Sequence, residues 1–253
     1  REDVLIFTAI NFVFAGRLRE GIATFETLLG DVPADALSST ASPLISRELD
    51  NATPGAAQII LAAAYSEAGQ HPRALELVHQ LRAIGEQLQN DRLLDEAQLF
   101  LGLLHAKRGN WKAALPSTEA AFTHFCTGND EPGYGWFAGV ALALTRAHQG
   151  CYEQSRSAFD AAVQEWRRAG SPPLGNESFC LFELFEAAGE SPPSSIDFIA
   201  EAERSLASPI LMSAGAAQRF LASRLARRAS TPTEQAAALA AFDRALQVLH
   251  EAG

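Results

Sequence analysis

The chain has 253 residues, of which 47% are hydrophobic and 20% are charged, so it can bury a core and is not a disordered segment. Its formal net charge of -10 argues against direct binding of nucleic acid, because neutralising phosphates requires a basic surface. No window approaches the roughly 18–20 uninterrupted apolar residues of a membrane span, and three scattered cysteines predict a reducing, cytoplasmic compartment.

Apolar residues recur at helical spacing along the whole chain, and no stretch shows the alternation of a strand. The first predicted helix pair covers Asp3–Ala15 and Leu18–Leu29. The segment Gly30–Pro54 is rich in Ser, Pro, Asp and Thr and predicts a linker, with a short helix over Pro43–Asp50. The later predicted helices are Gly55–Ala68, Pro72–Leu88, Asp91–Arg108, Trp111–Cys126, Tyr134–Gln149, Tyr152–Arg168, Leu174–Ala188, Ser194–Ala207, Pro209–Arg228 and Thr233–Glu251.

One unit repeats within this series. The stretches Leu61–Leu75, Leu101–Leu115 and Leu142–Arg156 each contain an apolar helix, a glycine turn and the start of a second helix. The turn glycines are Gly69, Gly109, Gly150 and Gly189, so the steps from 69 to 109, 109 to 150 and 150 to 189 are 40, 41 and 39 residues. A weaker copy surrounds Gly16.

The residues around each turn predict how the two helices meet. The glycine ends the first helix, because a left-handed backbone is needed there. Two residues later, Trp111 or Tyr152 is expected to fill the space where the helices join. Small residues on both helices predict a close approach that larger side chains would strain. These small residues are Ala62, Gly102 and Ala143 on the first helices and Ala74, Ala114 and Ser155 on the second.

This pattern resembles the tetratricopeptide-repeat superfamily over nearly the whole chain, most strongly in residues 55–170. The resemblance implies an all-α fold, a right-handed α–α superhelix of about six antiparallel helix pairs. It implies a single array over residues 1–253, with a first pair (1–29), a linker (30–54), three well-formed repeats (55–170) and divergent C-terminal repeats (171–253). The spacing exceeds the roughly 34 residues of the standard unit, which indicates longer helices and loops.

The resemblance also implies that the first helix of each pair lines a concave groove, and that this groove binds a partner. The candidate partner-binding residues are Ile59, Ala63, Glu67, Leu99, Leu103, Lys107, Val140, Leu144 and His148. Two arrangements remain open: an open apolar groove for a peptide or ligand, or a narrow groove filled by its own side chains. In the first arrangement, Leu103 faces water and Leu115 packs against neighbouring helices.

No catalytic constellation is found in the sequence. The glycines lack the Gly-Lys-Ser/Thr of a phosphate loop, and the histidines lack the spacing of a metal site. Acidic pairs such as Glu183 and Glu186 predict a solvated helix face rather than a general acid. We therefore expect no enzymatic activity, no metal and no cofactor.

A narrower resemblance rests on the 40-residue spacing, the Gly-x-Trp/Tyr turn and the helix ending Glu165-Trp166-Arg167-Arg168-Ala169-Gly170. These features are similar to the repeat regions of bacterial signalling ATPases, including maltose-regulator-like, LuxR-type transcriptional activators. The resemblance implies a sensor or scaffold that binds a protein, a peptide, another domain of its parent or a small inducer. Because the chain starts at Arg1, we expect a piece of a longer protein.

Two alternatives to this interpretation remain open. One is a free-standing assembly scaffold built of tetratricopeptide repeats. The other is a peptide-pheromone receptor, which would line its groove with asparagines, and only Asn176 lies near the expected positions.

Overall fold

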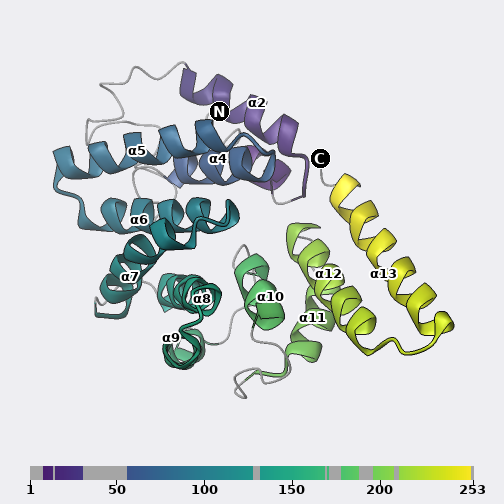
Figure 1. Ribbon diagram of the computed structural model, residues 1–253. Helices are drawn as coiled ribbons and strands as arrows, with labels where there is room; N and C mark the ends of the chain where they lie inside the picture. The colour runs from purple at the N-terminus through teal and green to yellow at the C-terminus, as the bar shows by residue number, and fades with distance from the viewer. Residues whose placement is uncertain are drawn as a thin grey trace. The chain divides into compact units, whose positions relative to one another are not determined.

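The computed structural model describes residues 8–13, 15–30, 56–127, 132–168, 170, 178–187, 196–207 and 211–251. Within these ranges every regular element is a helix, which confirms the predicted all-α class (Figure 1). Residues 8–13 are helical, and most of the predicted linker and Gly189 lie outside the described residues. The other helices are α2 (Leu18–Gly30), α4 (Ala56–Glu67), α5 (His71–Leu88), α6 (Asp91–Lys107), α7 (Trp111–Thr127), α8 (Pro132–His148), α9 (Tyr152–Arg168), α10 (Ser178–Ala187), α11 (Phe198–Leu206), α12 (Leu211–Arg228) and α13 (Pro232–Glu251).

The helices pack as consecutive pairs, as the sequence predicted. Short turns join α4 to α5, α8 to α9 and α12 to α13, and the two helices of each of these pairs contact each other. First helices of neighbouring pairs also touch, since α4 contacts α6, and α10 contacts both α8 and α12. Second helices contact the first helix of the next pair, as in α2 with α4 and α5 with α6. This is an all-α helical-repeat architecture.

The turn glycines hold the backbone conformation that the sequence predicted. Gly16, Gly69, Gly109 and Gly150 have φ between 70° and 76°, which residues with a Cβ rarely adopt. The following N–H donates back to the carbonyl five residues earlier, which closes the helix end. The N···O distances are 2.7 Å from Gln70 to Tyr65, 2.9 Å from Asn110 to His105 and 2.9 Å from Cys151 to Arg146.

Small residues allow the paired helices to approach closely, as predicted. A Cβ on Gly102 would lie 2.6 Å from Thr118 Cγ2 and 3.4 Å from the Ala114 carbonyl oxygen. In the next pair, Ser155 Oγ donates a 2.6 Å hydrogen bond to the backbone carbonyl of Ala143. Any side chain at position 102 would therefore push α6 away from α7, and one larger than Ser at position 155 would push α8 away from α9.

The first helix pair also has a small residue, Gly21, at its closest contact. A Cβ on Gly21 of α2 would lie 2.7 Å from Val13 Cγ2 and 3.2 Å from the Ala9 carbonyl oxygen. Ala9 precedes Gly16 by seven residues and Gly21 follows it by five, which is the register of Gly102 and Ala114 around Gly109. The repeat therefore extends to the helical residues 8–13.

The predicted role of Tyr152 as a plug between helices is wrong. Tyr152 is the first residue of α9 and is 62% exposed, because a side chain in the first turn points back past the helix end. The α8–α9 contact instead contains Trp136, Phe159 and Trp166, with ring centroids 6.2 Å apart for Trp136–Phe159 and 5.6 Å for Trp136–Trp166. Trp111, the other proposed plug, is half-buried.

The chain divides into two compact units, residues 1–121 and 122–253, and the boundary falls inside α7. The first unit has a core of aliphatic side chains with Phe25 and Tyr65, drawn from residues 8–13, α2, α4, α5 and α6. The second unit is rich in aromatic rings: Phe182 stacks on Phe220 at 5.4 Å, and Phe159 meets Phe198 edge-on at 6.3 Å. Among the described helices, none has both the length and the apolar character to cross a membrane.

Candidate partner-binding surface

The apolar residues of the predicted groove belong to the core. Ile59, Leu99, Leu103, Val140 and Leu144 have exposed fractions of 4%, 0%, 6%, 0% and 0%. The expectation that Leu103 faces water is therefore wrong, and Leu115, expected to be packed against neighbouring helices, is half-buried. Of the two arrangements left open, burial fits the groove that is filled by its own side chains.

The physical reason lies in α6 and α8 as whole helices. All residues of 101–104 on α6 and of 138–145 on α8 are buried. Four consecutive residues cover every side of an α-helix, so both helices are enclosed all round over these stretches. Over these stretches α6 and α8 each lie inside their own unit and do not form the wall of an open groove.

The remaining candidates reach the surface at the C-terminal ends of these helices. Glu67, Lys107 and His148 each stand two residues before a turn glycine. Glu67 and Lys107 belong to the first unit, and we call these two residues the polar row. Glu67 and His148 are exposed, and Lys107 is half-buried, as is Ala63 one turn earlier on α4. The structure therefore divides the nine predicted residues into five core residues and a smaller, mostly polar set.

The two residues of the polar row contact each other. Lys107 Nζ forms an ion pair with the Glu67 carboxylate, which links the end of α4 to the end of α6. The two residues are 40 positions apart, one full repeat, so the pair joins equivalent positions of neighbouring repeats. A surface ion pair contributes only about 0–1 kcal/mol, so its main effect is to orient the two side chains.

Histidines near the turns are held neutral. His148 is exposed as a residue, but partial burial of its imidazole lowers the pKa below its usual value, so the neutral form predominates at pH 7. Burial also lowers the pKa of His105, with smaller contributions from the positive charge of Arg108 and from His79. At neutral pH the polar row therefore presents one negative and one positive group, and His148 of the second unit is neutral.

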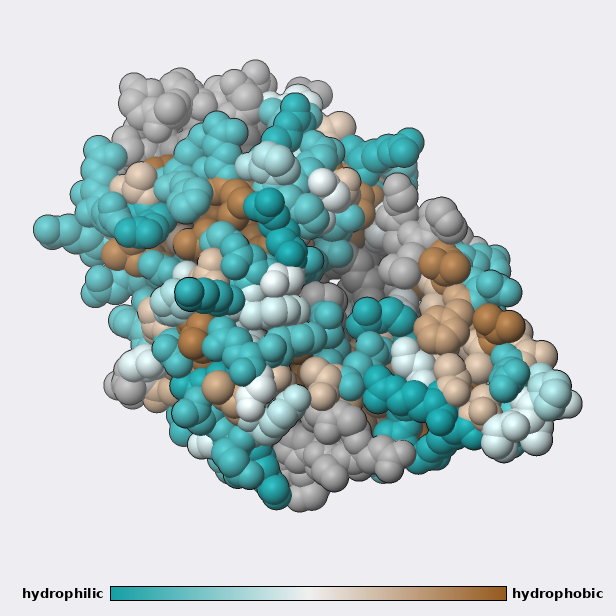
Figure 2. Space-filling model, in the orientation of Figure 1, coloured by the Kyte–Doolittle hydropathy of each residue, from teal (hydrophilic) through white to brown (hydrophobic). Residues whose placement is uncertain are grey.

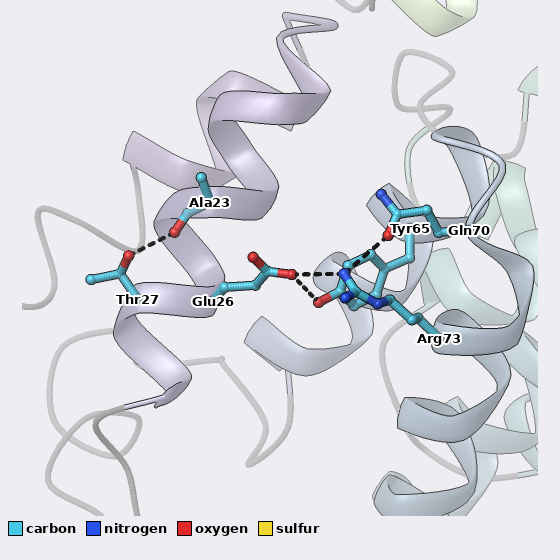
Figure 3. A network of polar contacts seen from close by, with 6 residues as sticks. All are labelled: Ala23, Glu26, Thr27, Tyr65, Gln70 and Arg73. Atoms are coloured by element: carbon cyan, nitrogen blue, oxygen red, sulfur yellow. Dashed lines mark hydrogen bonds and ion pairs between the residues drawn. The ribbon is translucent and has the colours of Figure 1, made fainter.

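A second polar cluster connects residues on either side of the predicted linker (Figure 3). Glu26 of α2 accepts a 2.8 Å hydrogen bond from the Tyr65 hydroxyl of α4 and a 3.2 Å hydrogen bond from Arg73 Nη1 of α5. Arg73 Nη1 also donates to Gln70 Oε1 at 3.1 Å. The cluster fixes α2 against the α4–α5 pair.

The environment of Tyr65 favours its neutral form. Burial is the largest cause and the hydrogen bond to Glu26 the second, and together they raise the pKa of Tyr65 to about 12. A folded-state pKa above the unfolded value of 10.0 means that this contribution to stability is complete below pH 10. It is lost as the pH rises from 10 towards 12.

We expect Tyr65→Phe to lower the free energy of unfolding by about 1 kcal/mol at pH 7, the usual value for one hydrogen bond. The variant should also lose the part of the stability decline between pH 10 and 12 that comes from this hydroxyl. Urea unfolding followed by circular dichroism at both pH values measures the two effects. Tyr152→Phe is the matched control, because the Tyr152 side chain is 62% exposed, and an equal loss in both variants would contradict the role given to Tyr65.

The described residues hold little that could act as a nucleophile or metal site. No group of three or more His, Cys, Asp or Glu side chains among them could hold a metal ion. Cys126, Cys151 and Cys180 are free thiols. Burial first and the Glu165 carboxylate second raise the pKa of Cys126 to about 11, so this thiol stays protonated at neutral pH and is a weak nucleophile.

Comparison with known proteins does not place the chain in a family. No protein-family model matches the chain, and no curated protein matches it.

Proposed function

We propose that the chain is a tetratricopeptide-like scaffold that binds a protein, a peptide or another domain of a larger protein, and that it does not catalyse a reaction. The observation that supports this proposal is the Glu67–Lys107 pair. It presents side chains of opposite charge at equivalent positions of two neighbouring repeats, while the apolar residues of the same helices form core. A surface built in this way recognises charge pattern and shape rather than apolar side chains.

The charges of the polar row indicate which kind of partner the chain would bind. A carboxylate beside an ammonium group suits an extended segment that carries both charge signs, or a small polar inducer. The asparagine-lined groove of a peptide-pheromone receptor is not favoured, because Glu67 and Lys107, and not asparagines, stand two residues before the turn glycines Gly69 and Gly109. We further propose a cytoplasmic role in bacterial signalling or transcription regulation, next to an ATPase module, in keeping with the resemblance of the 40-residue repeats.

A charge swap tests whether the polar row recognises a partner. Lys107→Glu should abolish capture of the specific partner in pull-down experiments quantified by mass spectrometry, and it should lower the free energy of unfolding by no more than about 1 kcal/mol. The double variant Glu67→Lys with Lys107→Glu restores an ion pair but reverses its direction. We expect it to recover the stability and not the binding.

The double variant separates recognition from structure. Recovery of both stability and binding would mean that the pair only holds α4 against α6. A partner retained equally by the wild type and both variants would contradict recognition by the polar row.

A further inference from the structure

Helix α13 presents two leucines, Leu239 and Leu246, to solvent while three of its alanines are buried. Ala238, Ala241 and Ala245 are buried, with exposed fractions of 3%, 0% and 2%. Leu239 and Leu246 are 66% and 55% exposed. An amphipathic helix at the edge of a fold normally buries its leucines, so this orientation leaves apolar area uncovered.

The exposed side chains form a stripe along the helix. Leu239, half-buried Phe242 and Leu246 follow one another at spacings of three and four residues, which is the a/d pattern of a helix–helix seam. We call these three residues the α13 face. Of the five large apolar side chains that are exposed among the described residues, three lie on α12 and α13: Leu225, Leu239 and Leu246. Figure 2 shows brown and tan residues along α13, at the right of the view.

The start of α13 is fixed, so the face is held on a well-defined helix. Thr231 and Glu234 form a capping box: Thr231 Oγ1 accepts from the Glu234 N–H at 3.3 Å, and the Glu234 carboxylate accepts from the Thr231 N–H at 2.9 Å. The Ser230 N–H donates to the same carboxylate at 2.8 Å. The hydrogen bond from Ser230 is the first of several that lower the pKa of Glu234 to about 2, so the cap is ionised at neutral pH.

Charge makes the α13 face suitable for another copy of the same chain. Between Gln235 and Gln247 the only charged residues are Asp243 and Arg244, so this segment is neutral while the whole chain carries -10. Two copies would repel each other at most acidic surfaces, but not here. The side-chain sizes on this surface also suit a second copy. Exposed Ala236 and Ala240 leave space beside Leu239 and Leu246, and the leucines of a second copy can pack into that space.

We propose that two copies of this chain pair through their α13 faces about a two-fold axis, with the two helices antiparallel. Each copy then supplies both the protruding side chains and the flat places of the seam, as a two-fold interface requires. Burial of Leu239, Phe242 and Leu246 against the second copy removes the exposed apolar stripe from water. The pairing is independent of the partner recognition proposed for the polar row.

Sedimentation velocity on the full chain, from about 1 µM to about 100 µM, tests the proposal. We expect a concentration-dependent species of twice the 27.1 kDa chain mass. Leu239→Glu and Leu246→Glu should each raise the dissociation constant at least about tenfold, because each buries a carboxylate in the seam. Leu206→Glu on α11 is the matched control, since Leu206 is 40% exposed outside the α13 face, and it should leave the dimer unchanged.

Three outcomes would overturn the proposal. The wild type could remain monomeric over the whole range, even if its α13 face captures a helix of another protein. The dimer could persist in both Glu variants, which would place the contact elsewhere. The dimer of the Leu206→Glu variant could also dissociate as readily as the dimers of the two α13 variants. If circular dichroism shows that a Glu variant is unfolded, Leu239→Gln and Leu246→Gln replace it in the same comparison, with the same expected order.

Discussion

Leu103→Glu is expected to destabilise the protein by about 3–5 kcal/mol, which unfolds a domain of ordinary stability. Leu103 is only 6% exposed, so the new carboxylate would lose its hydration without gaining a partner. The same change also removes the apolar burial of a leucine, which contributes about 1.5–3 kcal/mol. Urea unfolding at pH 7, followed by circular dichroism at a helical band, measures the loss.

Leu206→Glu is the control for this substitution. It introduces the same side chain at a position that is 40% exposed, and the carboxylate can remain hydrated. We expect a loss below about 1 kcal/mol there, as for most surface changes. If Leu103→Glu lowered the free energy of unfolding as little as Leu206→Glu, the α6 surface around Leu103 would be open to water in solution. The open apolar groove would then be the better description.

Gly102→Leu is expected to lower the free energy of unfolding by about 1–3 kcal/mol through overpacking. Its Cβ would lie 2.6 Å from Thr118 Cγ2 and 3.2 Å from the Thr118 backbone nitrogen. The second of these atoms belongs to the α7 backbone, so the strain cannot be relieved by a side-chain rotation alone. Thermal and urea unfolding of the purified variant measure the effect.

Ala120→Leu on α7 is the matched small-to-large change. Ala120 is exposed on the helix that carries Thr118, so a leucine there meets solvent instead of α6. We expect a change within about 0.5 kcal/mol. Equal losses for Gly102→Leu and Ala120→Leu would mean that the α6–α7 distance does not depend on the small residue.

The sequence predicted the elements and their pairing because local physics determines both. Glycine at positive φ ends a helix wherever it occurs, and the small residues around Gly109 mark a close helix contact without reference to the rest of the chain. Within the described residues, the predicted helices therefore agree with the structure to within a few residues. Tyr152 marks where the local pattern misleads, because a side chain in the first turn of α9 points past the helix end instead of into the contact with α8.

The candidate site was predicted less well, for reasons of packing. The positions of Leu99 and Leu144 in a groove were inferred from a family in which the first helices border water, whereas here long helices enclose them. The Glu26 cluster could not be predicted either. Its contacts span 39 residues to Tyr65 and 47 to Arg73, and no spacing rule connects residues across a linker of that length.

The short separation between the small residues that meet within a pair has a consequence for how the chain folds. Ala143 and Ser155 are 12 positions apart, so an α8–α9 hairpin can form its closest contact by closing a very short loop. Chains rich in such local contacts have low contact order and fold in microseconds to milliseconds. In a repeat array each hairpin can act as the nucleus, and structure then spreads to its neighbours on either side. Substitutions at these close contacts should therefore slow folding as well as reduce stability, while changes on the polar row should leave the folding rate almost unaltered.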